Sequence, residues 1–374
     1  MAQTKLQILH ALGSMDPGGV ETWLLHVLKY IDRDRLQLHI CTFGPQPGLY
    51  ASKVEELGGK MLRCPKGANL WSFRRRFRKI LREGNYHVVH SHVHLFSGAL
   101  LRWARAEGVP NRIAHSHTAQ VANGDTLARH YYRRLMKSWI DRYATHGLAA
   151  SRLAAAQLFG EKWETDCRFR VLHCGIDLHP FQESIDQEGT RRELGIPVDA
   201  LVVGHVGRFD APKNQRFLLE IAREVLKRRT DVHFLLVGDG PLRVEIEDRA
   251  REMGLSGRTH FVGIRTDVPR LMRGAMDVFV FPSLWEGLPV TVVEAQAAGL
   301  RCILSDAISG EVSILPEQSY RLPLSKGAEE WAVKTIDTLE RGKIVCESAV
   351  RAIAETDFCM QRSGLSELYL RAME

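Results

Sequence analysis

Short runs of apolar residues alternate with amphipathic stretches along the whole chain of 374 residues. Each run is short enough to be a buried strand, whereas stretches such as ETWLLHVLKYI have the period of a helix. This alternation is typical of an α/β fold in which helices cover parallel, doubly wound sheets. Strands are expected at residues 5–12, 36–43, 87–93, 112–117, 146–151 and 168–174, and then at 201–208, 233–240, 259–263, 277–283 and 301–306.

The length of the chain favours two domains, because a single hydrophobic core stops growing at roughly 250–300 residues. The polar stretch 181–197 separates the two series of strands and is interpreted as a linker. We therefore expect an N-terminal domain of residues 1–180 and a C-terminal domain of residues 181–354, with a helix in residues 355–374 that packs back on the first domain. Open α/β sheets bind ligands at the carboxyl ends of their strands, which favours a site in a cleft between the domains.

The composition is ordinary for a globular protein, with 45% hydrophobic and 25% charged residues. No stretch reaches the roughly 18 consecutive apolar residues of a membrane span, and no signal-peptide cleavage region precedes the first strand, so a cytoplasmic location is expected. The seven cysteines are scattered without a CxxC pair, which argues against disulfides and structural zinc. A net charge of +7 favours anionic partners such as phosphates, nucleic acid or lipid head groups.

Glu294 stands in a stretch that is otherwise apolar. Pro289 suits a first helical position and Gly299 suits a helix end, so a helix is predicted over residues 289–298. At about 100° per residue, Glu294 falls in the middle of the apolar sector of that helix. A charge there is costly unless something accepts it, so the carboxylate either caps a neighbouring loop or contacts a ligand.

Three glycine-rich turns after predicted strands are candidates for phosphate binding. Gly18 and Gly19 allow a close backbone approach at the start of a helix, whose N-terminus favours an anion. Beside Gly207, Arg208 and Lys213 could clamp a diphosphate and stabilise it as a leaving group. The third turn, VGDGPLR, has an arginine where a dinucleotide fingerprint needs its third glycine, which argues against a dehydrogenase.

Several motifs together resemble the family 4 retaining glycosyltransferases of the GT-B fold, most closely their capsular and exopolysaccharide branch. The motifs are GGVET, GRFDAPKN, FVG followed by RTDVPRLM, and DVFVFPSLWEGLPVTVVEAQAAG. The most specific element is the spacing of Glu286 and Glu294 within PSxxEGxPxxxxEAxAxG. The resemblance covers essentially the whole chain, and it implies two doubly wound, Rossmann-like domains that face each other across a cleft.

The resemblance also implies residue roles at matching positions. Glu294 would hold the ribose hydroxyls of a nucleotide-sugar, and Glu286 would lie by the transferred sugar. His117 would lie near the reacting sugar, where it positions the donor or activates the acceptor, unless it is simply a core histidine. The catalytic set is Arg208, Lys213, His117 and Glu286. The donor-binding set is Gly18, Gly19, Gly207, Arg208, Lys213, Val262, Gly263, Arg265, Glu286, Gly287, Leu288 and Glu294.

The reaction implied by this resemblance transfers a sugar, with a UDP-sugar as the expected donor, to a hydroxyl of a lipid-linked glycan with retention of configuration. The family needs no cofactor and no obligatory metal. The chain departs from the family pattern at His173 and Cys174, where asparagine commonly precedes the position of Gly175. A nucleotide-sugar 2-epimerase and a soluble-acceptor enzyme of the same fold remain open, as does the more distant alternative of a basic nucleic-acid-binding protein. We expect no nucleic-acid partner.

The stretch LWSFRRRFRKILRE, residues 70–83, predicts a basic amphipathic helix that suits an anionic membrane surface. A second basic aromatic stretch, RHYYRRLMKSW, follows in the same half. The lipid-linked acceptors of the resembling branch favour a peripheral location at the inner face of the cell membrane. In the alternative, the apolar stripe packs in the core and the charges are only solvated. The residues assigned to this surface are Arg74, Arg75, Arg76, Arg78 and Lys79.

His90, His92 and His94 alternate within HVVHSHVH, so on a strand they would share one face and resemble a zinc site. No carboxylate or thiolate signature accompanies them. We therefore favour a histidine cluster at a strand end over a metal site.

Overall fold

The computed structural model describes the chain in three stretches, residues 5–67, 69–118 and 126–371. Its internal contacts separate two compact units, each of which is described by itself below. The first unit comprises Met1–Gly175 together with Met360–Glu374, and the second comprises Ile176–Cys359.

In the first unit, parallel strands form a sheet in the order β3-β2-β1-β4-β5-β6-β7. Every pair of neighbours is parallel, so all strands end at the same edge of the sheet. The strands are β1 (Leu6–Leu12), β2 (Leu36–Thr42), β3 (Lys60–Arg63), β4 (Val88–Ser91), β5 (Asn111–Ser116), β6 (His146–Ala149) and β7 (Phe169–Val171).

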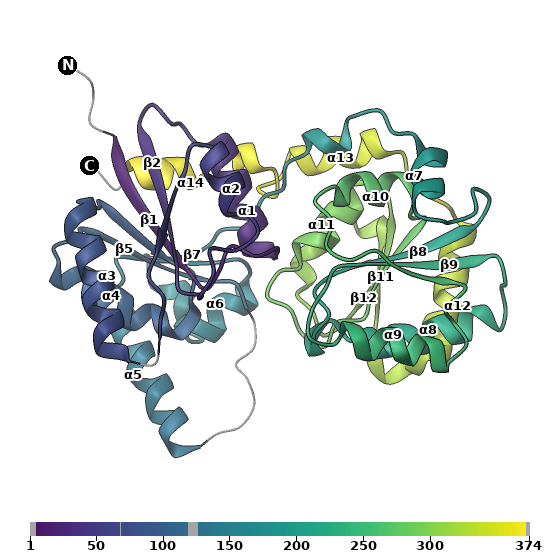
Figure 1. The fold of residues 1–374 in the computed structure, drawn as a ribbon, viewed down its shortest axis with the longest axis horizontal. Helices are drawn as coiled ribbons and strands as arrows, with labels where there is room; N and C mark the ends of the chain where they lie inside the picture. Colours follow the sequence, from purple (N-terminus) through teal and green to yellow (C-terminus); the bar gives the residue numbers. More distant parts are fainter. Residues whose placement is uncertain (1–4, 68, 119–125, 372–374) are drawn as a thin grey trace. The chain divides into compact units, whose positions relative to one another are not determined.

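The crossovers of this sheet carry the helices of the first unit (Figure 1). The α-helices are α1 (Gly19–Tyr30), α2 (Ala51–Glu56), α3 (Leu70–Gly84), α4 (Ser97–Ala106), α5 (Leu127–Tyr143), α6 (Arg152–Phe159) and α14 (Leu365–Arg371). Short 3₁₀ turns are η1 (His94–Phe96), η2 (Trp163–Thr165) and η8 (Met360–Arg362).

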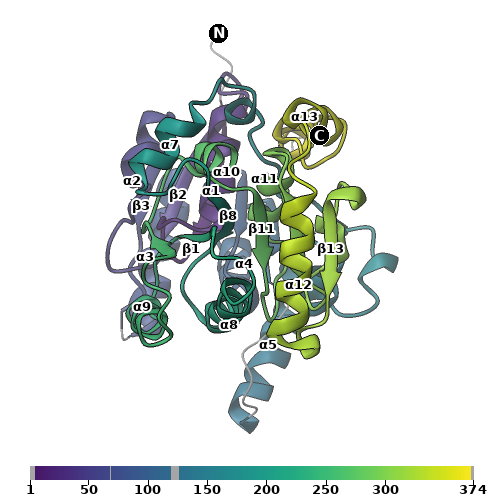
Figure 2. The same ribbon diagram turned by 90° about the vertical axis from the view of Figure 1, so that its right-hand side faces the viewer.

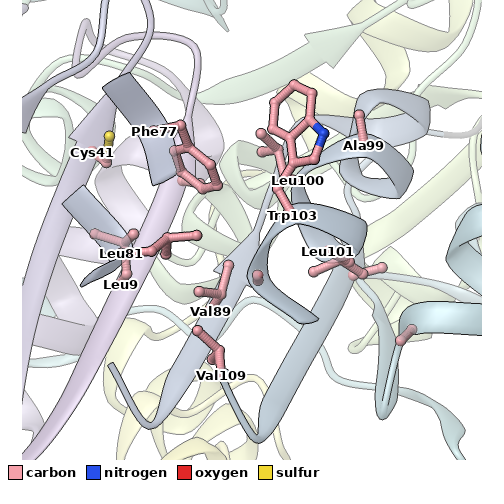
Figure 3. Packing of buried hydrophobic residues seen from close by; sticks show 14 of the residues in the cluster. Leu9, Cys41, Phe77, Leu81, Val89, Ala99, Leu100, Leu101, Trp103 and Val109 are labelled. Atoms are coloured by element: carbon pink, nitrogen blue, oxygen red, sulfur yellow. The ribbon is translucent and has the colours of Figure 1, made fainter. Parts of the chain in front are cut away.

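One face of the first sheet packs against α3, α4 and α5. Phe73 and Phe77 of α3 are fully buried, and both rings lie about 6 Å from the ring of Trp103 in α4, at 6.0 and 6.3 Å between centroids. Figure 3 shows Phe77 and Trp103 above Val89 of the sheet. Since the apolar stripe of α3 is occupied by this core, it does not face a membrane.

The opposite face of the first sheet carries histidines where the other face carries apolar residues. His10 of β1 pairs in register with His90 of β4, and both are fully buried. The hydroxyl of Tyr369, in the C-terminal helix α14, lies 2.6 Å from Nδ1 of His90 and 3.2 Å from Nε2 of His10. The last helix thus lies beside the central strands of the first sheet (Figure 1). Residues 372–374 of the expected terminal helix lie outside the described residues.

In the second unit, strands again pair only in parallel, in the order β10-β9-β8-β11-β12-β13. The strands are β8 (Leu201–Val206), β9 (Val232–Val237), β10 (Thr259–Phe261), β11 (Val278–Phe281), β12 (Arg301–Ser305) and β13 (Ser319–Leu322). The α/β prediction of two parallel, helix-covered sheets is confirmed.

The helices of the second unit follow its strands in the same alternating way. The α-helices are α7 (Gln187–Glu193), α8 (Gln215–Leu226), α9 (Arg243–Glu252), α10 (Val268–Gly274), α11 (Val290–Ala297), α12 (Gly327–Glu340) and α13 (Cys346–Ala354). The 3₁₀ turns are η3 (His179–Phe181), η4 (Ala211–Lys213), η5 (Gly310–Val312), η6 (Pro316–Gln318) and η7 (Leu324–Lys326).

The stretch 181–197 is not a linker. The chain enters the second unit after Gly175 and leaves it after Cys359, so this stretch lies inside the unit. Its α7 packs against α10, and a Cβ atom added to Gly274 would lie 2.8 Å from Oγ1 of Thr190. The stretch is polar because α7 is a surface helix.

Two strands were not predicted, and both lie at a sheet edge. The residues of β3 and β13 are half-buried or exposed, so neither strand shows an apolar run. Figure 2 shows β13 at the outer edge of the second sheet. Edge strands need less apolar surface than central ones, which explains why the pattern missed them.

Candidate active site

The predicted phosphate-binding residues lie where the central strands of the second sheet end. The loop 207–214 follows β8, and the loop 282–289 follows the adjacent strand β11. Asn214 Nδ2 donates to the carbonyl of Pro282 at 3.1 Å, and the amide of Leu284 donates to the carbonyl of Pro212 at 2.8 Å. These hydrogen bonds hold the two loops together as one site.

Glycines allow the loop after β9 to pack against the same site. Gly238 has a φ of +132°, and a Cβ atom there would lie 2.1 Å from the carbonyl oxygen of Gly207. A Cβ atom at Gly240 would lie 2.5 Å from the carbonyl oxygen of Phe209. The glycines of VGDG are therefore needed for close loop packing.

The charges of the site alternate in sign. Lys213 Nζ lies 2.5 Å from Oε1 of Glu286, and both side chains are largely buried. Arg208 is different, because its side chain is 67% exposed and its nearest described carboxylate, Asp210, is 3.9 Å away. Burial raises the pKa of Asp210, while Lys213 and Arg208 oppose that shift. An exposed guanidinium beside a held ammonium can receive a multiply charged anion.

Two polar side chains are buried on α11, and only one of them is satisfied. Gln296 Nε2 donates to the carbonyls of Val292 at 3.1 Å and Val312 at 2.6 Å, and its Oε1 accepts from the amide of Leu315 at 2.9 Å. Glu294 is 9% exposed, and the described residues supply no hydrogen bond or ion pair to its carboxylate. Burial raises the pKa of Glu294 to about 7. A hydrogen-bond donor from a ligand would stabilise the ionised form of such a carboxylate.

The helix that carries Glu294 starts one residue later than predicted. Pro289 is the N-cap of α11, with φ −75° and ψ 95°, and the helix begins at Val290. The helix is buried on nearly every side rather than along one stripe. The loop before this helix contains two of the predicted donor-binding residues, Gly287 and Leu288. The side chain of Leu288 is buried, at 8% exposed.

Three of the predicted donor-binding residues, Val262, Gly263 and Arg265, follow β10. Gly263 has a φ of +69° and accepts a hydrogen bond from the amide of Gly238 at 2.8 Å. The guanidinium of Arg265 is already engaged, because it lies 2.8 Å from Asp267 and 2.9 Å from Glu193. These carboxylates raise the pKa of Arg265. The backbone of this segment is engaged as well, because the amide of Val262 donates to the carbonyl of Leu236 at 3.2 Å.

The first unit holds the other predicted site residues. Gly18 is the extended N-cap of α1, and Gly19 is its first residue, with open space where a Cβ atom would lie. His117 follows β5 and is half-buried, with its Nε2 atom 2.9 Å from Nδ1 of His92 and its Nδ1 atom 3.7 Å from Sγ of Cys174. Cys174, one of the two residues at which the chain departs from the family pattern, thus contacts His117.

His117 belongs to a cluster of histidines that the sequence revealed only in part. The predicted group of His90, His92 and His94 is wrong in its third member, because His94 lies in η1 with a φ of +49° and joins neither group of neighbouring ligand atoms. The members that sequence reasoning missed come from β1, β5 and α14. The cluster consists of His10, His90, His92, His115, His117 and Tyr369.

The basic residues of α3 are not equivalent. Arg78 is ion-paired with Glu107, whose side chain is only 7% exposed, and Arg76 donates to the carbonyl of Pro65 at 2.5 Å. Arg75 and Lys79 are exposed, and Arg74 lies over the ring of Trp71. Arg78 is thus a structural residue.

Over the stretches that the structure describes, no helix is both long and apolar enough to cross a membrane.

Two units, each built on a parallel, helix-covered sheet, with a candidate ligand site at the strand ends of the second, are the architecture of the GT-B fold class. A family model described as "Glycosyltransferase Family 4" matches residues 17–179, and one described as "Glycosyl transferases group 1" matches residues 200–341. The chain therefore belongs to glycosyltransferase family 4 and is a glycosyltransferase.

Individual proteins agree with the family assignment. The chain is 34% identical over 373 residues to the glycosyltransferase EpsF of Bacillus subtilis, covering 97% of this chain and 95% of that protein. It is 30% identical over 239 residues to the UDP-Gal:alpha-D-GlcNAc-diphosphoundecaprenol alpha-1,3-galactosyltransferase of Escherichia coli, covering 61% of this chain and 60% of that one.

A solved structure agrees with the fold. The structure of Anabaena Alr3699/HepE in complex with UDP superimposes with a TM-score of 0.78 at 20% identity, covering 99% of this chain and 100% of that chain.

The first prediction concerns the stability cost of Glu294. Its pKa in the folded chain is about 7, above the ordinary 4.5, so folding disfavours the ionised form. The resulting loss of stability is absent below pH 4.5, grows as the pH rises to 7, and is complete above pH 7. Glu294→Gln should therefore raise the free energy of unfolding at pH 8 by roughly 3 kcal/mol and change it little at pH 4. Chemical denaturation from pH 4 to 8 measures this difference.

Glu252→Gln is the matched control, because it makes the same substitution at an exposed carboxylate. If Glu294→Gln and wild type differ by the same amount at every pH, the carboxylate is not held in the unpaired, buried state described above.

Proposed function

We propose that the protein is a retaining glycosyltransferase that moves a sugar from a UDP-sugar to a hydroxyl of a lipid-linked glycan in cell-surface polysaccharide biosynthesis. The single observation that carries the proposal is the buried carboxylate of Glu294, which has no partner among the described residues although Gln296 on the same helix is fully satisfied. Two ribose hydroxyls donating to this carboxylate would stabilise its ionised form and offset the cost of its burial.

The cations of the site suit the diphosphate of such a donor. As the bond between sugar and diphosphate breaks, negative charge grows on the leaving group, and Arg208 and Lys213 would stabilise that charge. Lys213 is held by Glu286 before the donor arrives, so its ammonium needs little reorganisation. Glu286, released from part of this ion pair, would accept hydrogen bonds from the transferred sugar.

The relatives support the choice of donor and acceptor. The galactosyltransferase of E. coli is named for a UDP-linked donor and a diphosphoundecaprenol acceptor, and a relative in Staphylococcus aureus is named for capsular polysaccharide biosynthesis. Solved structures of the Anabaena protein contain UDP, and one contains UDP-glucose. These names favour a UDP-sugar over other nucleotide-sugars and a lipid-linked acceptor over a soluble one.

In this proposal, the first unit binds the lipid-linked acceptor and contacts the membrane. The first turns of α5 project from that unit (Figure 1), and residues 127–132 are all exposed. Leu127 is 79% exposed and Tyr131 is 68% exposed, and the exposed Arg129 and Arg134 lie on the same turns. Aromatic and leucine side chains beside cations suit the head-group region of an anionic bilayer. We therefore propose α5 as the main membrane contact, with Arg74 and Arg75 of α3 adding charge.

The second prediction separates binding from chemistry at the donor site. Glu294→Gln removes an ionised acceptor of ribose hydroxyls, so it should raise the KM for the UDP-sugar about 10- to 100-fold. Arg208→Ala removes charge stabilisation that matters most in the transition state, so it should lower kcat about 100- to 1000-fold. Release of UDP in the presence of a crude lipid-acceptor fraction measures both constants.

Arg251→Ala is the matched control, because its side chain is 69% exposed and that of Arg208 is 67% exposed. Wild-type constants in both site variants would refute the assignment. Donor turnover that needs no acceptor and yields a free sugar isomer would instead identify a 2-epimerase.

The third prediction is that transfer needs no Mg²⁺ or Mn²⁺. Arg208 and Lys213 supply the positive charge that such an ion would otherwise bring to the diphosphate. Turnover should therefore be undiminished in excess EDTA. Loss of activity in EDTA that Mg²⁺ or Mn²⁺ restores would show that the cations of the protein do not suffice.

The fourth prediction tests the membrane contact. The full chain should sediment with vesicles of phosphatidylglycerol and phosphatidylcholine at low salt. The triple variant Leu127→Ser, Tyr131→Ser, Tyr132→Ser should bind at least tenfold more weakly because it loses the exposed apolar contact. The variant Arg74→Gln, Arg75→Gln should lose about 1 kcal/mol for each charge near the surface.

Salt should weaken the binding of wild type, because charges are screened beyond about 8 Å at physiological ionic strength. Val244→Ser is the control, since Val244 is 72% exposed but lies in α9 of the second unit. Vesicle binding by the triple variant equal to that of wild type would remove α5 from the membrane surface. Arg78 is left unchanged, because its loss would leave the buried Glu107 with Arg82 alone as an ion-pair partner.

A further inference from the structure

The histidine cluster of the first unit forms one continuous chain of hydrogen-bonded groups. It runs from Cys174 through His117, His92, His10, Tyr369 and His90 to His115, with each ring nitrogen of the inner histidines facing the next group. The chain folds back on itself, so the rings of its two terminal histidines, His115 and His117, lie 3.9 Å apart between centroids. Burial lowers the pKa of His10 and His117 to about 3, so these rings are neutral at pH 7.

Where this chain of hydrogen bonds turns back, two buried nitrogen atoms have no hydrogen-bond partner within the described residues. One is Nε2 of His115, at the end of the chain of hydrogen bonds, and the other is Nε1 of Trp23. The indole ring of Trp23 lies 5.4 Å from His115, 5.9 Å from His117 and 6.0 Å from His92. The indole N–H can only donate, so the group here that could bind a cation is the unpartnered Nε2 of His115.

We propose that His92, His115 and His117 form a binding site for a divalent transition-metal ion of the zinc class. One ring nitrogen from each of the three lies within 4.8 Å of the other two, and neither of the possible ligand groups in this cluster contains a carboxylate. A set of neutral imidazoles selects zinc, cobalt, nickel or copper over calcium and magnesium, which prefer oxygen.

The partners of the three rings match what metal-binding histidines require. The other nitrogen of each ring is already held: His92 Nε2 by His10 at 2.9 Å, and His115 Nδ1 by His90 at 3.1 Å. Cys174 Sγ takes the same place beside His117. Partners of this kind set the tautomer and orientation of a ligating ring. The nitrogens that would face the ion are Nε2 of His115, which is unpartnered, and Nδ1 of His92 and Nε2 of His117, whose hydrogen bond to each other the ion would replace.

The geometry needs only a small adjustment. Nδ1 of His92 and Nε2 of His117 are 2.9 Å apart, whereas zinc–nitrogen bonds of about 2.0–2.1 Å at a tetrahedral angle hold two nitrogens about 3.3 Å apart. His92 and His117 are half-buried while His115 is fully buried, so an ion can enter from the side of the first two. In the second possible group, His10, His90 and His92, an ion would also have to break a hydrogen bond of His90 to Tyr369 or His115, neither of which belongs to that group, so the group is less suited.

The test uses the full chain without a polyhistidine tag, stripped with a strong chelator and titrated with Co²⁺. One equivalent of Co²⁺ should give the visible absorption of a nitrogen-ligated ion, and Zn²⁺ should displace it. His92→Gln and His117→Gln should each weaken Co²⁺ binding at least tenfold, whereas His94→Gln, which changes a histidine outside the site, should not. Cys174→Ser changes only a supporting group and should weaken binding about 10- to 100-fold.

Each variant is compared by circular dichroism, so that a misfolded protein is not counted as a lost site, and Cys174→Ser remains informative if a histidine variant does not fold. The proposal is overturned if wild type binds neither Co²⁺ nor Zn²⁺, or if His92→Gln, His117→Gln and Cys174→Ser bind as well as His94→Gln. Complete loss in His10→Gln with unchanged binding in His117→Gln would place the ion in the other group and would equally overturn it. Because the readout is metal binding, the result is independent of whether the donor is a UDP-sugar.

Discussion

Parallel strand pairing is the constraint on which the rest of this structure depends. Every neighbouring pair in both sheets is parallel, so the residues that follow the strands all meet at one edge of each sheet. In the second unit this brings the loop of Arg208, after β8, to the loop of Glu286, after β11, although these two residues are 78 positions apart in the sequence. In the first unit the same rule brings His10, His92 and His117 together from three strands.

Burial then decides what each of these side chains can do. A polar side chain inside the fold is either satisfied, as Gln296 is by three backbone groups, or keeps a cost that a ligand can remove. Glu294 keeps that cost as a carboxyl pKa raised to about 7. The histidines of the first unit avoid the cost by remaining neutral and by sharing protons with one another. Desolvation thus leaves a carboxylate that can accept hydrogen bonds from a ligand in one unit. In the other unit it leaves neutral imidazole nitrogens that can donate a lone pair to a metal ion.

The sequence predicted the central strands and the residues that follow them, because buried parallel strands are continuous apolar runs. It could not predict β3 and β13, whose edge positions need little apolar surface, and it took the polar surface helix α7 for part of a linker. The spacing of Glu286 and Glu294 is local, so sequence alone could point to both residues. The contact of His92 with His10 was hidden because it depends on strand order: the two residues are 82 positions apart in the chain, and their ring nitrogens lie 2.9 Å apart.

The ion pair of Lys213 and Glu286 shows why the candidate site is built from opposite charges rather than from cations alone. An isolated ammonium on a largely buried side chain would lose its proton or its position, since desolvation disfavours the charged form. Glu286 holds the ammonium of Lys213 in place, and the centroid of the Phe281 ring lies 5.0 Å from that ammonium. Arg208 needs no such partner because its side chain is exposed to solvent. A ligand with both phosphates and hydroxyls can then replace the ion pair on both sides, which a simple anion cannot do.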